Sequence, residues 1–91
     1  MNKSAEQGCA EAYTALAMHY DAKQDKQKAI EYYTKGAELG DADAQFLIGS
    51  SYLYGMDVEK DEQKAIYWLT LASEQDHESA YVELCKLKKQ K

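Results

Sequence analysis

Apolar residues recur three and four positions apart along most of the chain, which is the spacing of an α-helix packed on a neighbour. Ala44, Ile48 and Tyr52 form one such stripe. Phe46 and Leu53 make further sides of the same segment apolar, so this helix must pack on more than one partner. The pattern predicts an all-α fold, with helices at about 8–20, 25–38, 41–54, 61–74 and 77–89.

Residues that start and stop helices stand at the predicted ends. Asp25 and Asp61 each precede a helical stretch, where an aspartate side chain caps free backbone N–H groups. Gly40 and Gly55 each follow one, where the backbone needs a positive φ that glycine adopts cheaply. The chain has no proline, so nothing of that kind interrupts the helices.

The chain repeats itself. Residues 8–20 match 40–52 at an offset of 32, and residues 25–40 match 61–76 at an offset of 36. The difference of four residues lies between the halves of the unit, where a loop is expected. A further half-unit starts near His77. A repeat of this length predicts stacked helical hairpins in one domain, 1–91, with repeats at about 8–39 and 40–75 and a half repeat or cap helix at 76–91.

Small and large residues recur at fixed places in the units. Alanines at equivalent positions are expected to let helices approach closely: Ala12, Ala44 and Ala80 in one set, Ala29 and Ala65 in another. Aromatic residues are expected to fill the larger gaps as part of the core: Tyr20, Tyr52, Tyr32 and Trp68. Leu16 and Ile48 occupy equivalent positions in the two units.

The second unit resembles the Sel1-like repeat, a relative of the tetratricopeptide repeat, through Ala44, Ile48, Gly49, Tyr52, Gly55, Val58, Asp61, Lys64, Ala65, Trp68 and Ala72. The first unit lacks the glycine–valine loop but keeps Ala12, Leu16, Tyr20, Asp25, Lys28, Ala29, Tyr32, Lys35 and Ala37. The resemblance spans about residues 5–86. It implies a short α-α superhelix, or solenoid, of two tetratricopeptide-like hairpins and a C-terminal capping helix.

The start of the chain is unusual for such a repeat. Ala5, Glu6, Gln7 and Gly8 resemble the closing segment of a unit, as 37–40 shows in the same register. Two interpretations stay open: an upstream repeat is absent from this chain, or a short solenoid uses the remnant as its first turn. At the other end, Lys86, Lys88 and Lys89 make one side of the last helix polar, as in a solubilising cap.

The charge balance argues against nucleic acid as a partner. Eleven lysines face sixteen acidic residues, which gives a net charge of −5, and there is no arginine. Four lysines fall in the last six residues, so residues 1–85 carry a net charge of −9. Such a chain repels phosphate and lacks the guanidinium groups that bind it in pairs.

Neither a signal peptide nor a membrane span is visible in the sequence, because no apolar stretch approaches about 18 residues. We therefore expect a cytoplasmic protein, or a periplasmic or secreted one if the chain is a fragment.

Few residues could carry out catalysis or bind a metal. His19 and His77 lie near opposite ends of the predicted stack, away from any second histidine or cysteine. Cys9 and Cys85 fall on the first and last helices, too far apart for a disulfide, and are expected to be reduced and buried. We predict no enzyme activity, no cofactor and no metal site.

Sel1-like proteins are adaptors and scaffolds, in bacterial signalling, secretion and host interaction among other settings, so the resemblance implies a protein that binds a partner peptide or domain. By register with tetratricopeptide units, the first helix of each pair lines a concave face. The residues predicted on that face are Glu11, Thr14, Met18, Asp21, Asp43, Phe46, Ser50, Leu53, Tyr54, Ser79, Val82 and Lys86.

Alternatives remain for this face and for the function. In so short a stack, Phe46, Leu53 and Tyr54 could instead pack on neighbouring helices. A small acidic repeat protein could also be an immunity protein or inhibitor that neutralises a toxin or enzyme, with its acids steering association. The two exposed ends of the solenoid could stack to form a homodimer.

Overall fold

A computed structural model describes residues 3–56 and 58–89, with side chains from Cys9 onward. It confirms the all-α prediction, because the described residues form helices joined by turns and loops. The helices are α1 (Lys3–Ala22), α2 (Lys26–Glu38), α3 (Ala42–Tyr54), α4 (Glu62–Ser73) and α5 (Glu78–Lys89).

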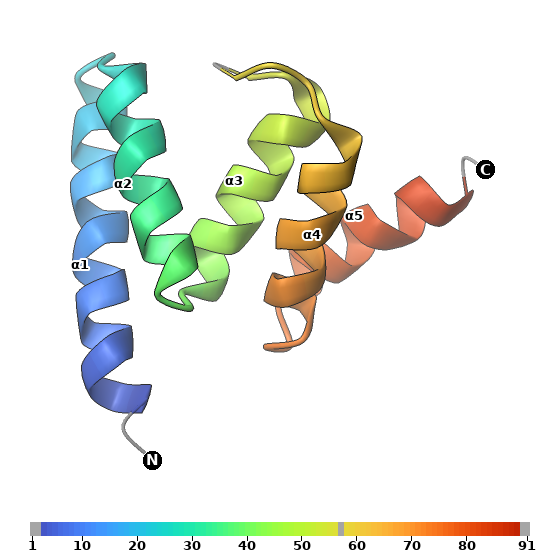
Figure 1. The fold of residues 1–91 in the computed structure, drawn as a ribbon, viewed down its shortest axis with the longest axis horizontal. Coiled ribbons are helices and arrows are strands. Elements are labelled where there is room, and N and C mark those ends of the chain that lie inside the picture. The colour runs from blue at the N-terminus through green and yellow to red at the C-terminus, as the bar shows by residue number, and fades with distance from the viewer. Residues whose placement is uncertain (1–2, 57, 90–91) are drawn as a thin grey trace.

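The helices stand in a row, each packed mainly on its neighbours in sequence. α1 and α2 form the first hairpin, α3 and α4 the second, and α5 follows (Figure 1). The row is flat, with extents of 38 × 35 × 16 Å, and α1 and α5 are its two edges. This is the solenoid of two hairpins and a final helix that the sequence predicts.

The helix ends use the residues that the sequence indicates. The Asp25 and Asp61 carboxylates accept the backbone N–H groups of Lys28 and Lys64, at 3.4 and 3.2 Å. Gly40 and Gly55 have φ values of +106° and +68°, in the region that favours glycine. The caps fix where each helix stops, and therefore the angle at which the next one packs.

Two clusters of buried residues form the core, and α3 contributes to both of them. The first joins α1, α2 and α3 through Ala17, Ala29, Tyr33, Ala37, Ala44 and Ile48. The second joins α3, α4 and α5 through Leu53, Ala65, Leu69, Ala72, Ala80, Leu84 and Leu87. The predicted packing of α3 on more than one neighbour is confirmed. The predicted aromatic residues are partly buried against the first cluster: Tyr20, Tyr32, Tyr52 and Trp68.

Glycines inside helices let the backbones approach closely at two places. A Cβ atom on Gly49 of α3 would lie 2.8 Å from Leu69 Cγ and 3.2 Å from the Leu69 backbone nitrogen. A Cβ atom on Gly36 of α2 would lie 3.1 Å from the Ala10 carbonyl oxygen and 3.3 Å from Ala44 Cβ. Gly36 therefore holds α1, α2 and α3 together at one crossing, and Gly49 holds α3 against α4.

The first helix differs from the prediction in three respects. It begins at Lys3, so the segment from Ala5 to Gly8 continues the helix and does not form a turn. Ala12 is exposed, although it was expected to let a helix approach closely, and Leu16, the equivalent of the buried Ile48, is exposed as well. Cys9 is also exposed and not buried, and its thiol is free. The exposure of Cys9, Ala12 and Leu16 has one physical cause, which is that no helix packs on this side of α1 among the described residues.

Candidate partner-binding face

The first helix of each unit, α1, α3 and α5, carries the twelve predicted residues, and we call this set the first-helix face. Most of the side chains reach the surface. Those that are exposed are Glu11, Met18, Asp43, Tyr54, Ser79, Val82 and Lys86. Those that are half-buried are Asp21, Phe46 and Ser50. The remaining two, Thr14 and Leu53, are buried.

Thr14 and Leu53 lie mostly beneath the surface, although both were expected to be exposed on the face. Thr14 is 5% exposed, and its hydroxyl donates to the Ala10 carbonyl oxygen at 3.0 Å and contacts the Asp41 carboxylate. Leu53 is 8% exposed and belongs to the second core cluster. Thr14 is therefore closed to a partner, whereas Leu53 keeps a small exposed area at the end of α3.

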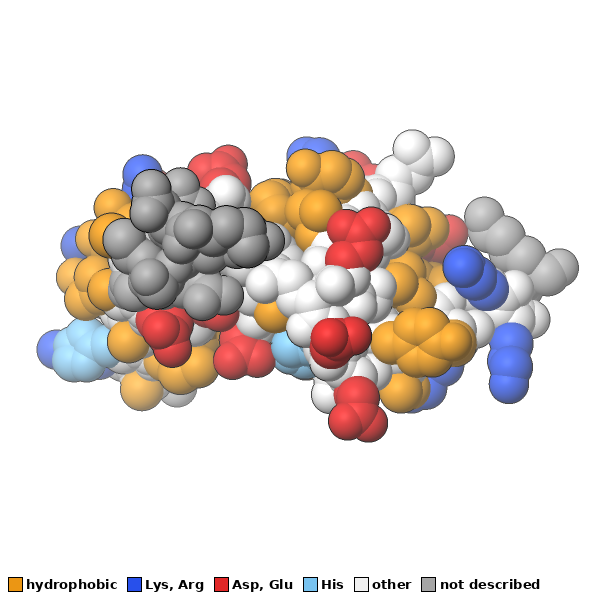
Figure 2. All heavy atoms as spheres, turned by 90° about the horizontal axis from the view of Figure 1, so that it is seen from below, with side chains coloured by type: hydrophobic (Ala, Val, Ile, Leu, Met, Phe, Trp, Pro, Cys, Tyr) orange, Lys and Arg blue, Asp and Glu red, His pale blue; other side chains and the backbone are white. Residues whose placement is uncertain are grey.

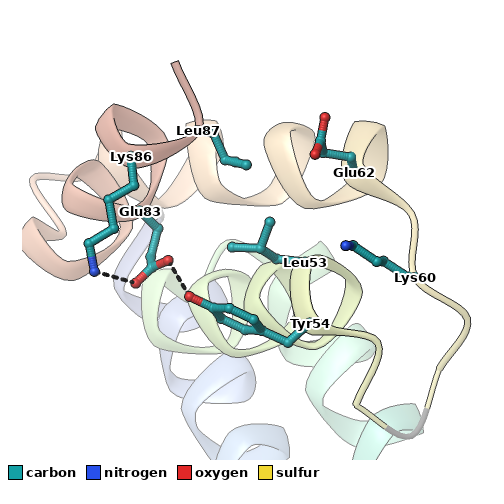
Figure 3. Close-up of a pocket in the computed structure, with 7 residues that line it drawn as sticks. All are labelled: Leu53, Tyr54, Lys60, Glu62, Glu83, Lys86 and Leu87. Atoms are coloured by element: carbon teal, nitrogen blue, oxygen red, sulfur yellow. Dashed lines mark hydrogen bonds and ion pairs between the residues drawn. The ribbon is translucent and has the colours of Figure 1, made fainter. Parts of the chain in front are cut away.

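A hollow of about 180 Å³ opens between the end of α3 and the second half of α5. Figure 3 shows it, with Leu53 and Leu87 between the charged groups of its rim. The lining residues are Leu53, Tyr54, Lys60, Glu62, Glu83, Lys86 and Leu87. The structure therefore brings three residues of the first-helix face together here, around an apolar floor: Leu53, Tyr54 and Lys86.

Glu83 organises one wall of this hollow. Its carboxylate accepts a hydrogen bond from the Tyr54 hydroxyl at 2.8 Å and lies 3.7 Å from the Lys86 ammonium nitrogen (Figure 3). The hydrogen bond to Glu83 raises the pKa of Tyr54 above the ordinary value for a tyrosine. The bond fixes the Tyr54 ring at the rim, while 59% of the residue remains exposed.

At the other end of α5, part of the face is used within the molecule. His77 Nε2 lies 3.0 Å from an Asp43 carboxylate oxygen, and its ring stacks on Phe46 with 4.8 Å between ring centres. His77 Nδ1 accepts the backbone N–H of Ala80 at 3.3 Å, which caps the start of α5. Phe46 and Asp43 therefore hold α5 against α3, in agreement with the alternative interpretation of Phe46.

A second hollow, of about 150 Å³, lies between α2 and α3 near the end of α1. Two residues of the first-helix face, Asp21 and Ser50, line it together with the Tyr33 ring. Burial raises the pKa of Tyr33, and the nearby Asp21 carboxylate raises it further. Met18, Glu11, Ser79 and Val82 line neither of the two hollows.

Comparison with known proteins decides the family. The Sel1 repeat model matches residues 10–41 and again 42–77, which together make up most of the chain. This chain belongs to the Sel1 repeat family. The crystal structure of a Sel1 repeat protein from Oxalobacter formigenes superposes on 96% of the chain, with a TM-score of 0.80 and 31% sequence identity. An uncharacterized Sel1-like repeat-containing protein of Schizosaccharomyces pombe is 42% identical over 55 residues, or 60% of this chain.

Both relatives are longer than this Sel1 repeat chain. It spans 37% of the Oxalobacter chain and 8% of the yeast protein. Sel1 repeats are generally modules of protein–protein interaction.

The repeat register misses the parts of the site that join one unit to the next. Glu83, Lys60 and His77 are absent from the predicted set, although each contacts or borders a residue within it. Register assigns positions on one helix at a time and carries no information about pairs that form across helices. Lys60 lies in the loop that is four residues longer in the second Sel1 unit, and that length difference is visible in the sequence.

The surface of the Sel1 repeat is unevenly charged. Figure 2 shows acidic side chains over the middle of one side and lysines at the end of the row next to the C-terminal residues. The last turn of α5 carries three lysines: Lys86, Lys88 and Lys89. A partner that approaches the hollow between α3 and α5 therefore meets both signs of charge.

Other chemistry is sparse within the described part of the chain. It holds no group of three or more His, Cys, Asp or Glu residues placed to bind a metal ion. Its two cysteines are free. None of the described helices combines the length and the apolar character that crossing a bilayer requires.

Proposed function

We propose that this Sel1 repeat domain binds a partner polypeptide on the first-helix face, with an apolar side chain of the partner seated in the hollow between α3 and α5. The observation that carries the proposal is the hollow itself. It combines an apolar floor, the exposed aromatic ring of Tyr54, and charged side chains at the rim, one of which, Glu83, accepts a hydrogen bond from Tyr54. Binding sites in proteins commonly join an apolar pocket to a few placed polar groups.

Large apolar side chains exposed on each first helix support the assignment. Met18 on α1 is 51% exposed, Tyr54 on α3 is 59% exposed, and Val82 on α5 is 47% exposed. Burying such groups against a partner is favourable by about 25 cal/mol for each Å² of apolar area. Because they sit on packed helices, little ordering cost opposes binding.

The polar rim indicates what else the partner segment contains. Lys60 and Lys86 stand beside Glu62 and Glu83 around the hollow. A segment with an apolar anchor flanked by one acidic and one basic side chain would meet complementary charges there. Rim charges of this kind set the orientation and the association rate more than the affinity.

The test compares two tyrosines with matched exposure. Tyr54 and Tyr67 are 59% and 58% exposed, and Tyr67 lies on α4, the second helix of its hairpin. The partner is first isolated from the organism that encodes the chain and is then titrated against each variant. We expect Tyr54→Ser to weaken binding about 30-fold, the effect of losing an aromatic hot spot of roughly 2 kcal/mol, and Tyr67→Ser to leave it unchanged.

Circular dichroism of both variants checks that the helices persist. Tyr54→Phe separates the ring from its hydroxyl, because it keeps the apolar surface and removes the hydrogen bond to Glu83. Binding that survives Tyr54→Ser but is lost in Tyr67→Ser would place the partner on another surface and refute the proposal.

A further inference from the structure

The repeat places equivalent residues on the three first helices, and these do not have equivalent surroundings. The equivalent pairs are Ala12 and Leu16 on α1, Ala44 and Ile48 on α3, and Ala80 and Leu84 on α5. The pairs on α3 and α5 are between 0% and 9% exposed. On α1, Leu16 is 43% exposed and Ala12 is exposed as well. On one side of α1, residues whose equivalents are buried in α3 and α5 are therefore exposed.

The structure shows twice what covers this side of a first helix. On α3, Ala44 and Ile48 are covered by the preceding helix α2, through Ala29, Tyr33 and Ala37. On α5, Ala80 and Leu84 are covered by the preceding helix α4, through Ala65, Leu69 and Ala72. In both cases a bulky side chain stands between two alanines, at helical spacing. The alanines of the covering helix let the first helix approach closely. The bulky residue between them packs beside the branched side chain of the first helix.

The uncovered surface of α1 continues this series. We define the outer face of α1 as Cys9, Ala12, Ala15 and Leu16, all of which are exposed and uncharged. Figure 1 shows α1 at the edge of the row, on the side where the next helix of the series would stand.

We propose that the outer face of α1 binds the second helix of another Sel1-type repeat, one that presents a bulky side chain between two alanines. This inference concerns a different surface from the first-helix face and does not depend on it. We infer this partner from α3 and α5, whose equivalent surfaces are each covered by a second helix. α1 has an alanine and a branched residue at the same spacing.

The experiment uses a helix of known fit as its probe. A synthetic peptide with the sequence of residues 25–39 carries the α2 stripe, and a lactam between its Glu31 and Lys35 side chains holds it helical. These two positions are four residues apart and exposed in α2, so the link leaves the packing stripe free. The peptide is titrated into the full ¹⁵N-labelled chain, and backbone chemical shifts report where it binds.

We expect the largest shift changes on residues 9–19 and a saturable titration. Leu16→Glu should weaken peptide binding at least tenfold, whereas Leu39→Glu should leave it unchanged. Leu39 is 38% exposed and follows α2, so it matches Leu16 in exposure and in the substitution made. A second peptide with Tyr33→Glu should fail to bind. Circular dichroism confirms that both protein variants remain helical.

Three results would overturn the proposal. The first is the absence of saturable binding, and the second is an equal effect of Leu16→Glu and Leu39→Glu. The third comes from sedimentation of the chain without peptide. A dimer that Leu16→Glu dissociates and Leu39→Glu leaves intact would show that a second copy of this chain covers the outer face.

Discussion

Gly49 and Leu69 meet where α3 crosses α4, and their contact sets the distance between the two helices. The space that a Gly49 side chain would need is taken by Leu69 Cγ and by the Leu69 backbone nitrogen. Leu69 is itself 0% exposed, so its side chain has little room to move. The close packing of the second hairpin therefore requires both the Leu69 side chain and the lack of a side chain at Gly49.

Gly49→Ala is expected to destabilise the protein, although alanine favours helix over glycine by about 1 kcal/mol. Overpacking a buried contact costs about 1–3 kcal/mol, and here the backbone nitrogen cannot yield. Urea unfolding measures the net loss. In a Leu69→Ala background the same substitution should cost less, because the clash with the Leu69 side chain is removed and only the contact with the backbone nitrogen remains. An equal cost in both backgrounds would show that Leu69 is not the obstacle.

Helices α1 and α3 carry equivalent residues at the same register, but only α3 has a neighbouring helix on both sides. Ile48 on α3 is 1% exposed between α2 and α4, whereas the equivalent Leu16 on α1 is 43% exposed. We expect Ile48→Ala to lower the free energy of unfolding by about 2–5 kcal/mol. Leu16→Ala should lower it by about 1 kcal/mol or less. Chemical denaturation of the two variants measures both changes in the free energy of unfolding. Equal decreases would show that this side of α1 is covered in solution.

Helix positions and caps could be predicted from the sequence because local chemistry dictates them. Asp25 and Asp61 begin helices, and Gly55 ends one, through contacts with residues close by in the chain. The exposure of Leu16 could not be predicted in this way. It depends on which helix stands beside α1, and the repeat pattern assigns Leu16 to the same environment as Ile48.

The candidate site shows the same division between local and long-range information. Register predicts that Tyr54 and Val82 are exposed, and the structure exposes both. It does not predict the bond from Tyr54 to Glu83 or the stacking of Phe46 on His77, because those pairs lie about thirty positions apart on different helices. Phe46 therefore helps to hold α5 against α3. Tyr54 is the better residue with which to test partner binding, because most of it is exposed.

At the scale of the whole molecule, the row of helices has several surfaces with different roles. The first helices present exposed apolar residues and the hollow beside α5, whereas the outer face of α1 presents uncovered core residues. A flat row only 16 Å thick buries few side chains completely and leaves much of each helix at the surface. Such a shape suits a scaffold whose surfaces meet other polypeptides.

The central claim, that a partner lies on the first-helix face, is tested most directly by photo-crosslinking in the complex. A benzophenone side chain is placed at Val82 in one variant and at Tyr67 in another, since both positions are exposed and lie on different helices. The account predicts a covalent product with the partner from position 82 and none from position 67. A product from position 67 alone would contradict it.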